Sequence, residues 1–129
     1  MKTALVCIAL LGLLIFGLGL AVSITRGTTK RSIGHSDDPT DWLHKLCRAH
    51  ANAAEYNPIL GLLMLVLGMR EPAVWVLWTM IFATVFRYTH VVGMIAMPTL
   101  AQPNALRFTG ALGTYVCGIL LVIALLTVA

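Results

Sequence analysis

Four long apolar segments, separated by shorter polar stretches, dominate the chain. They run from about Thr3 to Ile24, Ala51 to Met69, Ala73 to Met94 and Phe108 to Ala129. Each is close to the ~20 residues that a helix needs to cross a bilayer. The pattern predicts an all-α membrane protein, in which four transmembrane helices form a bundle and a single domain covers residues 1–129.

The first apolar segment has two possible interpretations. Lys2 could be the charged start of a signal peptide. The apolar stretch that follows exceeds the ~7–15 residues of a typical signal-peptide core, and no clear Ala-x-Ala cleavage site follows it. We therefore favour a retained helix.

The polar stretches predict where the helices begin and end. Asp38-Pro39 is typical of an N-cap followed by proline at the first helical position, so we expect the second helix to begin near Pro39. Arg70-Glu71-Pro72 predicts a short turn, and Pro98 and Pro103 exclude a regular helix through the third loop. The expected helices are therefore about 3–24, 39–69, 73–94 and 107–129.

Charge is scarce and unevenly placed. Charged residues make up 11% of the chain and hydrophobic residues 59%, whereas a soluble domain carries about 25% charge. No nucleic-acid motif accompanies the net charge of +4. The positive-inside rule places the first and third loops in the cytoplasm and both termini outside. Lys2 and Arg70 lie on the outer side, against Arg26, Lys30, Arg31, Lys45, Arg48, Arg87 and Arg107 on the inner side. The short termini without a retention signal favour a bacterial inner membrane.

The three cysteines support neither a disulfide framework nor a metal site, because no paired or CxxC spacing occurs. Cys47 lies beside Arg48, which could activate its thiol. We favour a packing role, since no base is identified near it.

A polar helical face opens the second apolar segment. At 3.6 residues per turn, Arg48, Asn52, Glu55 and Tyr56 fall on one side of the helix. Ionisable groups are costly at a membrane edge and usually face a bundle interior or a polar site. The face predicts a pocket for a small, charged, polar ligand.

Other polar residues are expected at the same membrane level. The third helix offers Arg87, Tyr88 and His90, and the fourth helix begins with Arg107. One alternative is a structural cluster in which Glu55 pairs with Arg48 or Arg87 to tie helices together. The arginines outnumber this single acid, however, which leaves cationic capacity for an anionic guest.

These residues resemble motifs of the MAPEG family, the membrane-associated proteins in eicosanoid and glutathione metabolism. The first motif is Arg48-Ala-His50-Ala-Asn52-x-x-Glu55-Tyr56-x-Pro58. The second and third are Arg87-x-x-His90-x-x-Gly93 and Pro103-Asn104-Ala-Leu106-Arg107-x-x-Gly110. The similarity extends over nearly the whole chain.

The resemblance implies a homotrimer that binds glutathione between subunits at the cytoplasmic face. Arg48, Asn52, Glu55 and Tyr56 would contact glutathione, with His50 nearby and Arg107 stabilising the thiolate. Arg87 joins the predicted binding set. Either Tyr88 or His90 would supply the contact from the third helix, depending on the alignment, and Arg26 loosely matches a further basic residue.

The implied function is a microsomal-type glutathione transferase or peroxidase, and on this ground we expect the chain to be an enzyme. A guanidinium favours the reactive thiolate, so glutathione is the only cofactor required, as co-substrate. A lipophilic electrophile would enter from the bilayer. The alternative is a non-enzymatic protein of the same fold that binds a lipid or a protein partner. A transporter or channel subunit ranks last, because the first and fourth segments lack polar residues along their depth.

Overall fold

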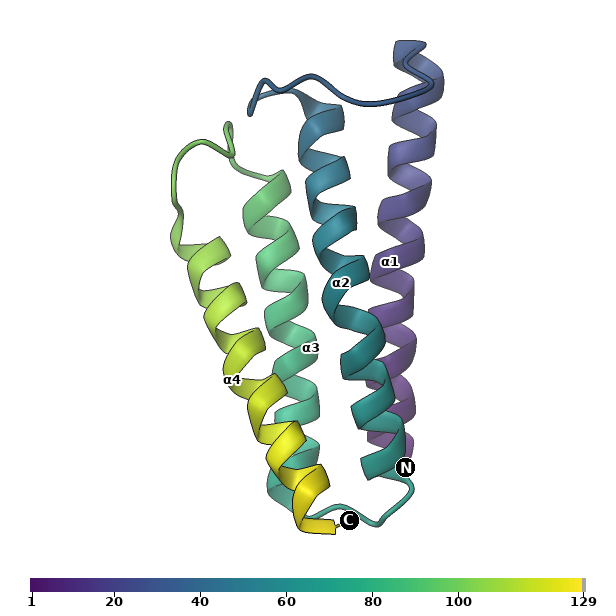
Figure 1. The fold of residues 1–129 in the computed structure, drawn as a ribbon, viewed down its shortest axis with the longest axis vertical. Helices are drawn as coiled ribbons and strands as arrows, with labels where there is room; N and C mark the ends of the chain where they lie inside the picture. Colours follow the sequence, from purple (N-terminus) through teal and green to yellow (C-terminus); the bar gives the residue numbers. More distant parts are fainter. Residues whose placement is uncertain (129) are drawn as a thin grey trace.

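The computed structural model describes the backbone of residues 1–128 and the side chains of residues 1–127. It contains four helices, α1 (Lys2–Thr29), α2 (Trp42–Gly68), α3 (Val74–Ile95) and α4 (Ala105–Val128), as Figure 1 shows. The predicted all-α bundle of four helices is confirmed.

The bundle consists of two helical hairpins placed side by side. α1 packs chiefly on α2 and α3 chiefly on α4, while no α-carbon of α1 lies within 8 Å of one of α4 in the described part of the chain. The α1–α2 and α3–α4 loops emerge at one end, and the two termini and the α2–α3 turn lie at the other (Figure 1). At the loop end the Leu100 N–H donates to the Pro39 carbonyl over 2.9 Å, which joins the two loops.

Three of the four helices are long and apolar enough to cross a membrane, namely α1, α3 and α4. Large apolar side chains face outward on them, such as Phe16 at 79% exposure and Phe108 at 67%. α2 is less apolar because its first half carries the polar residues that sequence reasoning singled out. It nevertheless runs alongside α1 (Figure 1), so those polar groups lie within the depth of the bundle.

The prediction for the start of α2 was wrong. The N-cap is Asp41, whose Oδ1 accepts the His44 N–H over 2.8 Å, and not Asp38. Asp38 instead accepts the N–H and hydroxyl of Thr40 and forms a local turn. The His44 N–H bond, assisted by Arg31, holds the pKa of Asp41 below its ordinary value despite partial desolvation. The cap is therefore present at neutral pH and is lost only as the pH falls through this lowered pKa.

Two further helix ends differ from expectation for local reasons. α1 continues to Thr29 instead of ending near Ile24, and the hydroxyl of Thr29 bonds to the Thr25 carbonyl. α4 begins at Ala105 instead of near Arg107, because the Asn104 side chain accepts the Arg107 N–H over 2.9 Å and caps the helix.

Glycines let α3 and α4 approach closely. A Cβ at Gly93 would lie 2.6 Å from the Arg107 nitrogen, and one at Gly110 would lie 2.5 Å from the His90 nitrogen. Both neighbours are backbone atoms, which cannot move aside independently. The distance between α3 and α4 therefore depends on glycine, which has no side chain, at these two positions.

We predict that Gly110→Ala destabilises the protein by about 1–3 kcal/mol, the usual cost of overpacking. Gly118→Ala on the same helix is the matched control, since its nearest neighbour would be a Leu60 methyl at 3.8 Å. Thermal unfolding of both variants in detergent measures the difference. Equal stability of the two variants would contradict the close-packing argument.

Candidate functional site

The Arg87 guanidinium is the most deeply buried charged group, at 1% exposure. Its Nε donates to Asn57 Oδ1 over 3.0 Å. Its Nη2 donates to Asn52 Oδ1 over 2.8 Å and to the Asn52 carbonyl over 3.1 Å. Asn57 in turn donates to the Leu11 carbonyl over 3.0 Å. One polar network thus connects α1, α2 and α3.

One alternative from the sequence was an ion pair between Glu55 and Arg48 or Arg87. In the structure the acceptors of the Arg87 guanidinium are instead the side-chain amides of Asn52 and Asn57. The one ion pair among the described residues joins Arg31 to Asp41 in the α1–α2 loop region, at 3.0 Å. Glu55 therefore pairs with neither Arg48 nor Arg87 within the chain. Helices are tied together as that alternative required, but neutral oxygens satisfy the guanidinium.

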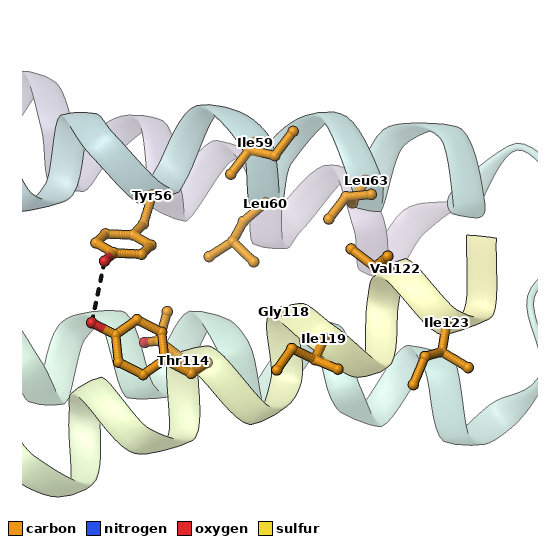
Figure 2. Close-up of a pocket in the computed structure, with 10 residues that line it drawn as sticks. Tyr56, Ile59, Leu60, Leu63, Thr114, Gly118, Ile119, Val122 and Ile123 are labelled. Atoms are coloured by element: carbon orange, nitrogen blue, oxygen red, sulfur yellow. Dashed lines mark hydrogen bonds between the residues drawn. The ribbon is translucent and has the colours of Figure 1, made fainter. Parts of the chain in front are cut away.

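Two tyrosines meet beside Arg87. The Tyr56 and Tyr115 hydroxyls lie 3.2 Å apart, and the Arg87 guanidinium carbon lies 5.1 Å from the centre of the Tyr56 ring. The pair bridges α2 and α4, and Figure 2 draws its hydrogen bond as the dashed line from the Tyr56 hydroxyl. Arg87 thereby holds the ring of one predicted ligand-binding residue and the amide of another.

An apolar groove of about 400 Å³ begins at the tyrosine pair and runs between α2 and α4. Figure 2 shows side chains of both helices lining it. The α2 side is formed by Ile59, Leu60 and Leu63, and the α4 side by Gly118, Ile119, Val122 and Ile123. The groove suits an apolar chain or ring with a polar end at the hydroxyl pair.

The polar face predicted for α2 divides in two. Arg48 and Glu55 are exposed on the outside of the bundle, whereas Asn52 and Tyr56 turn inward to Arg87. At about 100° per residue these four positions span an arc of roughly 100°, wide enough to cross from the outer to the inner surface. His50 is half-buried against α1, where a Cβ at Gly19 would lie 3.3 Å from its Nε2.

The candidate residues of α3 face other partners. The Tyr88 hydroxyl donates to the Leu10 carbonyl of α1 over 2.9 Å. The His90 Nδ1–H donates to the Arg107 carbonyl of α4 over 3.0 Å. Neither side chain is brought to the Tyr56–Arg87 cluster within one chain.

The predicted residues share one half of the bundle but are spread along its depth. Arg107 precedes Tyr115 by eight residues on α4, and Arg48 precedes Tyr56 by eight on α2. Eight residues of helix correspond to about 12 Å. Arg48 and Arg107 therefore lie near the loop end, and the tyrosine pair lies about two turns deeper.

The Arg107 side chain lies against the α3–α4 loop. Its Nη1 donates to the Leu100 carbonyl over 2.9 Å and to the Gln102 carbonyl over 3.3 Å. Its other two side-chain nitrogens donate to none of the described residues. The guanidinium is thus fixed at one nitrogen and has donors left for an anion.

Cys47 contacts Arg26 of α1 and not its sequence neighbour Arg48. The Arg26 Nη2 lies 3.8 Å from the Cys47 sulfur. Residues 1–128 contain no group of three or more His, Cys, Asp or Glu side chains placed to hold a metal ion.

Sequence reasoning missed Asn57 and Tyr115. The signal for Asn57 was present, because an amide inside an apolar run must find a partner in the bilayer. Tyr115 gave no such signal, since a tyrosine on an apolar helix is equally compatible with a lipid-facing position.

We predict that Arg87→Met destabilises the bundle by about 1–3 kcal/mol for each amide oxygen left without a donor. Arg70→Met, at the exposed α2–α3 turn, removes the same charge without such contacts and serves as the control. Unfolding by detergent titration measures both variants. Comparable stability would show that water replaces the guanidinium.

Comparison with known proteins agrees with the fold and the motifs. The model of the MAPEG family matches residues 4–127, nearly the whole chain. No curated protein and no solved structure matches it. Together with the bundle of apolar helices, the match makes this a multi-pass integral membrane protein. The chain belongs to the MAPEG family.

Proposed function

We propose that this protein is a membrane-bound, glutathione-dependent transferase that conjugates the glutathione thiolate to lipophilic electrophiles. Peroxidase chemistry, in which the same thiolate attacks a peroxide oxygen, is compatible with the same site. The family includes glutathione transferases among other enzymes, which supports the class of activity.

The observation that carries the proposal is the position of Tyr56. On one side it adjoins the polar residues of α2, and on the other it heads the apolar groove between α2 and α4. Glutathione on the polar side and an apolar electrophile in the groove could thus both border this residue, each in the environment that dissolves it. A purely structural cluster has no need of this adjacency.

The exposed side chains support an assembly. Arg48 and Glu55 are opposite charges on the outer surface of α2, without partners among the described residues. A neighbouring subunit would enclose them and complete a site for the ammonium and carboxylates of glutathione. We therefore propose the homotrimer that the family resemblance implies.

The chemistry requires only the thiolate. A free thiol has a pKa of about 8.5, so a nearby cation increases the reactive fraction at neutral pH. Arg107 is the proposed cation, through its donors that are not used by the loop. The sulfur then attacks the electrophilic carbon, a C–S bond forms, and the leaving group departs with its electron pair.

A second candidate is a non-enzymatic member that binds a lipid or a protein partner. The observation that favours it is the separation between Arg107 and the tyrosine pair, about 12 Å along α4. Turnover of an aryl halide with glutathione distinguishes the two candidates, because only the transferase consumes both compounds.

We place the loop end of the bundle in the cytoplasm, since six of the nine lysines and arginines lie near it, whereas Arg87 is buried deeper in the bundle. Accessibility labelling of a cysteine introduced at Ser36 tests this orientation. The expectation of a bacterial inner membrane stays a prediction, which membrane fractionation tests.

We predict that Glu55→Gln weakens glutathione binding by about 1.5–3 kcal/mol, the effect of losing a charge-assisted hydrogen bond. The substitution keeps the size of the side chain and removes its charge. Glu71→Gln, at the opposite end of the bundle, is the matched control. Calorimetric titration of glutathione into both variants measures the effect, and unchanged affinity in Glu55→Gln would remove Glu55 from the site.

We predict that Arg107→Ala lowers the thiolate absorbance of bound glutathione and the rate of conjugation. Each unit by which the pKa of the bound thiol rises corresponds to about 1.4 kcal/mol. S-methylglutathione has no thiol proton, so its affinity should change much less. An equal loss of affinity for both ligands would make Arg107 a binding residue, and no change in either would exclude it from the site.

A further inference from the structure

Lys45, on the first turns of α2, is a buried lysine with no acidic partner among the described residues. Its side chain is only 7% exposed. Its Nζ donates to the Met97 carbonyl over 3.0 Å and to the Ile95 carbonyl over 3.4 Å, and it lies 5.3 Å from the Trp42 ring centre. These carbonyls form the C-terminal end of α3, where the helix dipole favours a cation.

The same part of the chain holds the α3–α4 loop at a second point. The Pro39 carbonyl accepts the Leu100 N–H over 2.9 Å. The Leu100 carbonyl, on the same residue, accepts Nη1 of Arg107 over 2.9 Å. Lys45 and Pro39 thus fix the loop at Met97 and Leu100, and the loop fixes the guanidinium.

The remaining contacts of Arg107 locate its backbone. Asn104 bonds to the Gly93 carbonyl over 3.0 Å and to the Arg107 N–H over 2.9 Å. His90 bonds to the Arg107 carbonyl over 3.0 Å. These contacts determine where the side chain starts, whereas the loop carbonyls determine where its charged end lies. Because Lys45 is buried and contacts two carbonyls, its Nζ holds the start of the loop in a defined position, which a mobile surface lysine would not do.

We propose that Lys45 is a positioning residue, which holds the α3–α4 loop so that the Leu100 carbonyl directs the Arg107 guanidinium toward the thiol of the bound substrate. The inference rests on the proposed function, in which Arg107 stabilises the thiolate. Lys45 itself does not contact the substrate in this arrangement.

The test is a double-mutant cycle on the full-length protein in lipid nanodiscs, with the ionisation of bound glutathione followed by thiolate absorbance against pH. Lys45→Met keeps the apolar stem and removes the donor. The midpoint should shift upward, part of the way to that of Arg107→Ala. In the Arg107→Ala background, Lys45→Met should produce no further shift, because its effect passes through Arg107. Lys45→Arg should retain most of the wild-type midpoint.

Lys30→Met is the control, since Lys30 is an exposed lysine at the end of α1, on the same end of the bundle, and the substitution also removes one positive charge. It should leave the midpoint unchanged. If Lys45→Met does not assemble, Lys45→Gln is measured instead: its shorter, neutral side chain removes the cation from the end of α3, so the same upward shift of the midpoint is expected.

Two results would overturn the inference. A normal midpoint in Lys45→Met with reduced thermal stability would make Lys45 a cap for α3 alone. An equal shift with and without Arg107 would make it a direct electrostatic contributor. Failure of the proposed function is recognised separately, because Arg107→Ala would then leave the midpoint unchanged in the presence of native Lys45.

Discussion

The need to satisfy the buried guanidinium of Arg87 is the constraint on which the rest of the bundle depends. Inside a bilayer no water replaces a missing hydrogen bond, so every polar group must find a partner in the protein. Arg87 finds its partners on α2, through Asn52 and Asn57, and Asn57 continues the network to α1. Each hairpin packs well by itself, and this network locks the two hairpins together.

The hydrogen-bond network of Arg87 also determines which candidate residues remain accessible to a ligand. Asn52 and the ring of Tyr56 serve the interior, whereas Arg48 and Glu55 remain on the outer surface. The Tyr56 hydroxyl stays available at the mouth of the apolar groove. A single chain therefore holds a divided site, which is the physical reason for proposing that a second subunit completes it.

The loop end is organised by a different principle. Here backbone carbonyls are the acceptors, and cationic side chains bind them: Lys45 at the end of α3 and Arg107 at the α3–α4 loop. The glycine-dependent approach of α3 to α4 sets the position of the Arg107 backbone. Two cations, the buried Lys45 and the half-buried Arg107, are thus held by carbonyl dipoles without an acid among the described residues.

The sequence by itself determined the class of fold, the four helices and the family. The length of an apolar segment can be counted in the sequence without knowing the fold. The motifs around Arg48, Arg87 and Arg107 are each a short run of neighbouring residues, so they too can be recognised without the structure. It also indicated that the arginines exceed the acids available to them. The start of α2 was misplaced because Asp38 and Asp41 are both good caps, and only the folded chain shows which one meets a free N–H.

The tertiary structure alone decided how the polar residues are divided. A helical arc of four residues can face a ligand, a neighbour helix or both, and the choice depends on how α2 is rotated against α3. The partners of Asn57, Tyr115 and Lys45 all lie on other helices or loops. Their pairing follows from the packing of the two hairpins, which no local pattern encodes.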